Sequence, residues 1–220
     1  MKGAGIRSEA LLCSRPATGD IDGTVGDESF APLPPTAAWR HRGARSGFEV
    51  VYFGAREDRH RIEGWTTAIE DGATWVVEYV IETDAAWATR SAQIRGRSTE
   101  GSCSAVLEAD GAGQWLVNGE PAPHLDGCLD IDLEASAMTN ALPVRRMTLS
   151  PGAAAAAPAA YVRAAGLAVE RLGQTYLRAT GQGTGQSYDY AAPVFDFRCR
   201  LVYDQSGLVL DYPGIAVRAG

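Results

Sequence analysis

The chain has almost no lysine. Lys2 is its single lysine, so nearly all of its positive charge is carried by arginine. With 27 Asp and Glu against 20 Lys and Arg, the formal net charge is -7. This negative balance argues against nucleic acid or an anionic membrane surface as the main partner, because both carry the same sign of charge.

Cysteine and histidine are also scarce, and neither type is clustered. The four cysteines form no Cys-x-x-Cys pair and have no nearby histidine pair, which excludes the usual structural zinc spacings. We therefore expect reduced thiols, no metal and no other cofactor. The histidines are each expected at the surface. The residues concerned are Cys13, Cys103, Cys128, Cys199, His41, His60 and His124.

Long apolar runs and catalytic motifs are missing as well. No stretch approaches the roughly 20 apolar residues of a membrane helix, and no apolar signal-peptide region follows Met1–Arg7. These absences predict a cytoplasmic protein with no integral membrane segment. There is also no Gly-x-Ser-x-Gly elbow, phosphate loop or dinucleotide fingerprint.

The chain divides into a tail and one domain. At 220 residues and 45% hydrophobic, it can bury a substantial core. Residues 1–37 mix Gly, Asp, Ser and Pro without a sustained period, which predicts a disordered leader or a mis-called start codon. Residues 38–220 are expected to form the single folded domain.

The first part of the domain has the pattern of β-strands. Phe48–Phe53 and Trp75–Ile81 are rich in strand formers. Residues 105–107 and 115–117 flank a glycine-rich loop and predict a hairpin. Asn118-Gly119 is the favoured dipeptide of a type I′ turn.

The second part continues this pattern with little helical signal. Strands are expected over residues 129–133, 144–149, 167–172, 175–179 and 194–203. Residues 134–138 can form one helical turn, and the alanine run at 153–160 is expected to be a flexible connection because prolines bracket and break it. Many short strands predict a mainly β fold, an antiparallel sheet curled into a β-roll or half-barrel.

Asp130 and Asp132 are the leading polar candidates for a ligand site. On a strand both carboxylates project from one face, and they can pair with Arg145 and Arg146 if the next strand returns antiparallel. The Asp-x-Asp pattern can also hold a divalent cation, but the further oxygen ligands of a calcium loop do not follow. We favour ion pairs over a metal site, and either over a catalytic dyad.

Asn140 and Asp211-Tyr212 complete the polar candidates. Asn140 precedes Pro143 and predicts an Asx-type turn into the next strand, whereas Asp211 and Tyr212 end a strand before a Pro-Gly turn. Structural roles explain each alone. The density of Asp, Asn and Arg around one strand pair makes the group a candidate ligand site. Such a cluster must be satisfied, because each unpaired buried group costs about 1–3 kcal/mol.

Two tryptophans are the aromatic candidates. Trp87 shares its predicted strand face with polar residues. A ring in such a setting can stack on a sugar or flank an apolar cavity; it can equally close the end of a barrel. Trp115 is the second aromatic candidate for ligand contact.

Several sequence blocks resemble a known family. The blocks are Leu125–Met147 and Gly207–Gly214, with Trp39-Arg40 and Gly113-Gln114-Trp115. They are similar to the bacterial family called "putative glycolipid-binding", over roughly Ala38–Arg218. The resemblance implies an antiparallel β-roll similar in outline to periplasmic carriers of lipoproteins and lipids, with no established catalytic residues.

Three functions follow, in order of preference. The first is non-catalytic binding of a lipid or glycolipid on the concave face of the curled sheet. A concave face filled by the protein's own side chains would count against it. The second is an enzyme that acts on a small polar or glycan substrate through Asp130, Asp132 and Arg145. The third is an interaction protein that pairs through an exposed sheet edge.

Overall fold

The computed structural model describes residues 30–220 apart from positions 44, 57, 135 and 181–184. The predicted leader lies outside these residues except for positions 30–37, and the first strand already begins at Thr36. The strands are β1 (Thr36–His41), β2 (Arg45–Arg56), β3 (Arg59–Glu70), β4 (Ala73–Asp84), β5 (Thr89–Ser98), β6 (Gly101–Ala109), β7 (Trp115–Val117), β8 (Glu120–Pro121), β9 (Asp130–Leu133), β10 (Ala154–Ala156), β11 (Ala159–Val162), β12 (Val169–Leu172), β13 (Thr175–Arg178), β14 (Gln186–Ala192), β15 (Phe197–Tyr203), β16 (Val209–Tyr212) and β17 (Ala216–Ala219). The helices are α1 (Ala141–Met147) and the 3-10 turns η1 (Pro123–Leu125), η2 (Met138–Asn140) and η3 (Pro193–Phe195).

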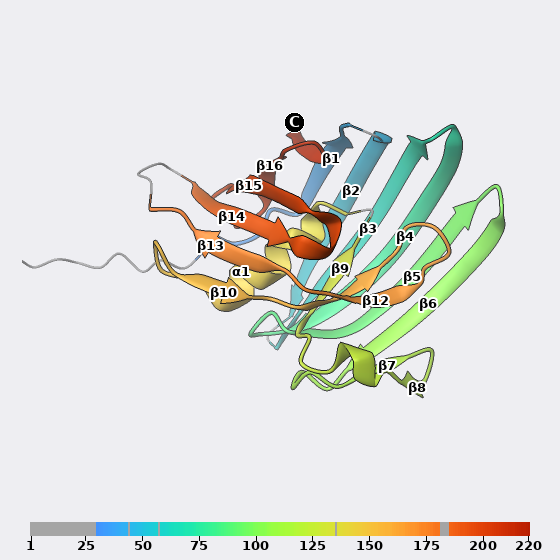
Figure 1. Cartoon of the computed structure of the whole chain (residues 1–220), viewed down its shortest axis with the longest axis horizontal. Helices are drawn as coiled ribbons and strands as arrows, with labels where there is room; N and C mark the ends of the chain where they lie inside the picture. Colours follow the sequence, from blue (N-terminus) through green and yellow to red (C-terminus); the bar gives the residue numbers. More distant parts are fainter. Residues whose placement is uncertain (1–29, 44, 57, 135, 181–184) are drawn as a thin grey trace, which may run out of the picture.

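One large antiparallel sheet dominates the described part of the chain. Its 14 strands run in the order β10-β13-β14-β15-β16-β17-β1-β2-β3-β4-β5-β6-β7-β8. The long strands β2 to β5 pair in register along most of their length. The sheet curls without closing into a barrel (Figure 1), so the predicted mainly β, curled-sheet fold is confirmed.

A smaller sheet lies inside the curve of the large one. It has the order β12-β11-β9, and β9 runs parallel to β11. A parallel pair requires a crossover connection, which here passes through η2, α1 and β10. Figure 1 shows α1 and β9 between the two halves of the large sheet. We call β9, η2, α1, β11 and β12 the inner layer.

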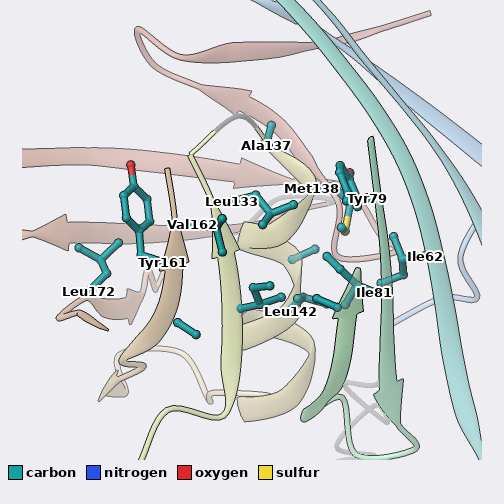
Figure 2. Packing of buried hydrophobic residues seen from close by; sticks show 14 of the residues in the cluster. Ile62, Tyr79, Ile81, Leu133, Ala137, Met138, Leu142, Tyr161, Val162 and Leu172 are labelled. Atoms are coloured by element: carbon teal, nitrogen blue, oxygen red, sulfur yellow. The ribbon is translucent and has the colours of Figure 1, made fainter. Parts of the chain in front are cut away.

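The inner layer packs directly on the concave face of the large sheet. Figure 2 shows Ile62, Tyr79 and Ile81 of β3 and β4 facing the inner layer. From that layer come Met138 and Leu142, and all five side chains are at most 1% exposed. Each buried apolar side chain of this size contributes about 1.5–3 kcal/mol. Over β3 and β4, the concave face is therefore filled by the protein's own side chains.

A buried carboxyl group also joins the two layers. Glu49 of β2 is 0% exposed. It accepts hydrogen bonds from the Tyr79 hydroxyl at 2.6 Å and from the Ala137 and Met138 backbone N–H groups at 2.8 and 3.4 Å, with a further bond from the Ser136 hydroxyl. Burial raises the pKa of Glu49 above its usual value. This network fixes η2 against the large sheet.

Two local predictions in the second half are wrong. Residues 141–147 form the helix α1, so the strand expected over 144–149 does not exist. Pro143 lies in the first helical turn, where its missing N–H is not needed. Asn140 is the residue before the helix and makes no side-chain cap, so the expected Asx-type turn is absent.

The alanine run is also structured, contrary to expectation. It contains β10 and the first two residues of β11, and every residue of β11 is buried. Small side chains let β11 lie between β9 and β12 inside the roll. The prolines therefore limit the ends of strands here and do not make the segment flexible.

The hairpin predictions in the first half hold. β6 and β7 form the expected hairpin, and Asn118 and Gly119 both have positive φ, 52° and 83°, as a type I′ turn requires. Trp87, in contrast, precedes its predicted strand, because β5 begins at Thr89.

The surface prediction for His41 is wrong. His41 is 6% exposed, and its Nε2 lies 2.8 Å from the Thr66 hydroxyl. Burial, with the nearby Arg45, lowers the pKa of His41 to about 4 and keeps the ring neutral. His124 is exposed, as expected.

Candidate functional site

A cleft of about 260 Å³ opens where the inner layer meets β14–β17. Its wall combines strands of both sheets with the turn η3, so segments far apart in the sequence converge there. The side chains divide into an aromatic group, a polar floor and a charged rim. The lining residues are Arg45, Asp132, Leu133, Glu134, Ser136, Asn140, Tyr161, Arg163, Leu172, Tyr190, Ala192, Phe195, Phe197, Tyr212 and Ile215.

Five aromatic rings form much of the wall. Tyr190 packs edge-on against Phe197 and Tyr212 at centroid distances of 6.2 and 6.1 Å. Tyr161 of β11, in the inner layer, lies 5.5 Å from Phe195 of η3, measured between ring centroids. Phe195 is 41% exposed and forms the outer lip. Rings placed in this way present apolar faces together with hydroxyl groups.

Asp132 lies on the polar floor. It is 6% exposed, and its Oδ1 accepts a hydrogen bond of 2.9 Å from the Thr139 hydroxyl. Burial, reinforced by Asp130 and Glu134, raises the pKa of Asp132 from 3.8 to about 6. The carboxyl group can therefore exist in either protonation state near neutral pH, and it can accept or donate a hydrogen bond.

Asn140 lies beside this carboxyl group on the floor. Its Oδ1 accepts a hydrogen bond of 3.0 Å from the Tyr176 hydroxyl, and its backbone carbonyl accepts one of 3.1 Å from Tyr203. These bonds fix the amide in orientation. Within the described residues the amide nitrogen has no bonded partner, so it can donate to a ligand in the cleft.

Two arginines and Glu134 form the charged rim. Arg45 is ion-paired with Glu134 at 3.3 Å and with Glu70 at 3.0 Å. Arg163 lies 3.8 Å from the same Glu134, and its guanidinium stands over the rings of Tyr161 and Phe195 at 5.2 and 5.3 Å. The rim thus supplies donors next to aromatic faces, a combination that binds polar groups and holds an apolar one nearby.

The structure brings some predicted residues to this cleft. Asp132, Asn140 and Tyr212 line it. Asp130 is fully buried behind them and forms a bidentate ion pair with Arg146, at 2.9 and 2.6 Å. The predicted Asp–Arg pairing is therefore confirmed for Asp130 and Arg146, although the arginine comes from a helix.

Other predicted residues lie elsewhere. Trp87 is stacked on His60 with ring centroids 3.8 Å apart, and the Arg145 guanidinium lies over the Trp87 ring, 4.2 Å from its centroid. Arg145 also donates to the Ser206 backbone carbonyl. These contacts hold α1 in place and do not reach the cleft lining.

Trp115 and Asp211 also lie apart from the cleft. The Trp115 indole donates to the Cys128 carbonyl at 2.9 Å, beside a second cavity of about 570 Å³. Asp211 lies 3.7 Å from Arg42 in an exposed ion pair. Their part in ligand binding stays a prediction.

Sequence reasoning did not identify Tyr161, Arg163, Tyr190 and Phe195 as site residues. Tyr161 and Arg163 lie just after the alanine run expected to be a flexible connection, and Phe195 falls in the strand expected over residues 194–203. The alternation of Tyr188 and Tyr190 in β14 was the available signal. Within the described residues, no group of three or more His, Cys, Asp or Glu is arranged to hold a metal.

Together these features define a class: an open β-roll around an inner layer, with an aromatic and charged cleft at their junction. Residues 36–218 match the family described as "Putative glycolipid-binding", and the chain belongs to that family. The resemblance predicted from the sequence is thereby confirmed. No helix in the described part of the chain is long and apolar enough to span a membrane.

A solved structure supports the same assignment. The chain is similar to a DUF1089 family protein from Pseudomonas aeruginosa, known from a crystal structure, with 30% sequence identity and a TM-score of 0.67. The alignment covers 87% of this chain and 98% of that one. Comparison with curated proteins finds no match.

Proposed function

We propose that the protein binds an amphiphilic ligand, a lipid or glycolipid, in the cleft between the inner layer and β14–β17. The observation that carries the proposal is the lining: five aromatic rings lie beside a carboxyl group, an amide and two arginines. Ligand sites typically combine apolar walls with a few fixed polar groups. The family description names the same class of ligand.

The size of the cleft determines how such a ligand fits. Sites for drug-sized ligands are about 300–1,000 Å³, and this cleft is about 260 Å³. It therefore encloses one end of an amphiphile. The remainder would run over the exposed lip, where Val194 is 71% and Phe195 41% exposed. We therefore propose binding at the edge of the concave face, because the inner layer fills its centre.

Native mass spectrometry of protein purified without detergent, followed by solvent extraction, tests this proposal. We expect a stoichiometric lipid or glycolipid, or its uptake from added lipid extract. Phe195→Ser should weaken uptake about tenfold or more, since it removes an aromatic contact of about 1.5–3 kcal/mol. Leu177→Ser is the matched control, because Leu177 is 39% exposed on β13 and does not line the cleft. An unchanged apo mass after adding lipid extracts would contradict the proposal.

Hydrolysis of a small polar or glycan substrate is the second candidate function. The observation in its favour is Asp132, whose pKa of about 6 suits acid–base work, next to the ion-paired Glu134. The cluster differs from the one expected, because Arg145 contacts Trp87 and not the carboxylates. The same extraction separates the two functions: a ligand recovered intact favours binding, and one cleaved by the wild type but not by Asp132→Asn favours catalysis.

A further inference from the structure

We propose that the outer face of β1–β5 docks on an anionic phospholipid membrane. This surface is on the convex side of the large sheet, away from the cleft, and the proposal does not depend on ligand binding there. Three observations carry it: an exposed apolar patch, arginines on two sides of the patch, and the curvature of the sheet.

The apolar patch consists of four large side chains on β2 and β3. Phe48, Tyr52, Trp65 and Ile69 are 52%, 54%, 39% and 55% exposed. Strand alternation turns them outward, since their neighbours such as Glu49 face the inner layer. Tyr52 and Trp65 contact each other edge-on at 6.0 Å. Contiguous exposed apolar patches larger than a few hundred Å² typically mark an interaction site.

Arginines flank this patch along the strand register. One row across five strands is Arg40, Phe48, Thr67, Val76 and Arg97, each residue opposite the next. An arginine therefore ends the row on both sides, and both arginines are exposed. Neither forms an ion pair with any residue that the structure describes.

A groove next to the patch contains a third exposed arginine. Arg95 lies two residues before Arg97 on β5 and is also exposed and unpaired within the described residues. With Trp65 and Val76 these arginines line a groove of about 460 Å³. Indole rings and arginines side by side are typical of the membrane interface, where the ring lies among the headgroups and the guanidinium contacts phosphate.

The acidic residues near the patch do not cancel this charge. Glu78 lies in the groove opposite Arg95, but Arg40, Arg95 and Arg97 outnumber it. Glu63 and Glu82 are ion-paired with Arg61 at 2.6 and 3.2 Å, and Glu82 also lies 3.7 Å from Arg59. The net charge of -7 belongs to the whole chain, and at physiological salt charges are screened beyond about 8 Å.

Curvature favours a membrane over a second copy of the chain. The inner layer fills the concave side, so the outer face is convex (Figure 1). Two convex faces touch over a small area, whereas a stable protein interface buries about 800 Å² on each partner. A fluid lipid surface can follow the curve.

Vesicle co-sedimentation of the full chain tests the proposal. We expect binding to phosphatidylcholine vesicles that contain phosphatidylglycerol, weak binding to pure phosphatidylcholine, and a decline with added salt. Arg95→Gln with Arg97→Gln should weaken binding about tenfold or more. Phe48→Ser with Ile69→Ser should weaken it similarly, and Glu78→Gln should strengthen it.

The matched control is Arg198→Gln with Arg200→Gln. These arginines have the same spacing on β15 and are also exposed. Their substitution removes the same amount of charge from a strand outside the proposed surface. Equal loss in this pair, or no vesicle binding by the wild type, would overturn the proposal. Self-association in light scattering that Phe48→Ser with Ile69→Ser abolishes would assign the face to a second copy and overturn it as well.

Discussion

At the scale of single residues, Asp132 is a carboxyl group whose ionised form the fold disfavours. Burial raises its pKa from 3.8 to about 6, so its ionised form is less favourable in the folded protein than in the unfolded chain. An asparagine would fill the same space without this cost. A buried carboxyl group that lowers stability while lining a cleft is typical of a functional position.

The pH dependence of stability should reveal this cost. Because the folded pKa of Asp132 is raised, its stabilising effect is complete below about pH 4 and is lost as the pH rises through about 6. The shift corresponds to about 3 kcal/mol. We expect the free energy of unfolding, measured in urea from pH 4 to 7, to fall less steeply in Asp132→Asn than in the wild type. Asp130 and Glu49, whose pKa values are also raised, would leave a residual slope.

Asp196→Asn is the control for this experiment, because Asp196 is exposed at the end of η3. It should leave the slope unchanged. Identical slopes in the wild type and in Asp132→Asn would show that the buried carboxyl group is not titrating in this range.

At the scale of elements, the contact between α1 and β9 includes one buried ion pair. Asp130 is fully buried, and its only ion-pair partner among the described residues is Arg146 of α1. Removing the arginine leaves an uncompensated buried carboxylate. Such a change typically costs about 3–5 kcal/mol.

A double-mutant cycle measures the strength of this contact. We expect Arg146→Met to lower the free energy of unfolding by about 3–5 kcal/mol, and Asp130→Asn with Arg146→Met to lower it by less, since no charge is then left unpaired. Urea unfolding at pH 7 gives the three differences. Additive effects of the two substitutions would mean that the pair does not act as a unit.

The elements also show what the sequence can predict. The strand segments Phe48–Phe53 and Trp75–Ile81 lie within β2 and β4, because alternation of apolar residues reports directly on a sheet with one buried face. α1 was missed because Pro143 signals a turn when the helix start before it is not recognised. β10 and β11 were missed because alanine has little strand preference, and only the packing inside the roll explains its use.

The site was less predictable than the strands. Asp132, Asn140 and Tyr212 were proposed as ligand-binding residues and lie in one cleft, but their proximity to Phe195 and Arg163 depends on the crossover that places β11 inside the roll. No local pattern encodes that crossover. Proximity between segments this far apart is a property of the tertiary fold.

At the scale of the whole molecule, the two proposed surfaces lie on opposite faces of one sheet. Consecutive residues of β2 illustrate this, since Phe48 points outward to the apolar patch and Glu49 inward to the inner layer. The attachment of the inner layer to the large sheet therefore also determines the shape of the cleft. Glu49 is one polar part of that attachment, beside the hydrogen bonds from Tyr176 and Tyr203 to Asn140.

Glu49 variants test whether the layers are held together in this way. Glu49→Ala leaves the Ala137 and Met138 N–H groups and the Tyr79 and Ser136 hydroxyls without their acceptor, at a cost of about 3–5 kcal/mol. Glu49→Gln should cost much less, because burial raises the pKa of Glu49 and glutamine resembles the protonated form. Its oxygen can accept from the two backbone groups, while the hydroxyls rotate to accept from its nitrogen.

Urea unfolding gives the stability of each variant, and hydrogen exchange at the Ala137 and Met138 amides reports the local attachment. We expect protection at these two amides to fall in Glu49→Ala and to persist in Glu49→Gln. Because Ser136 and Asn140 line the cleft on either side of these amides, a loosened η2 should also weaken ligand uptake. Full protection in Glu49→Ala would show that η2 is held against the large sheet without Glu49.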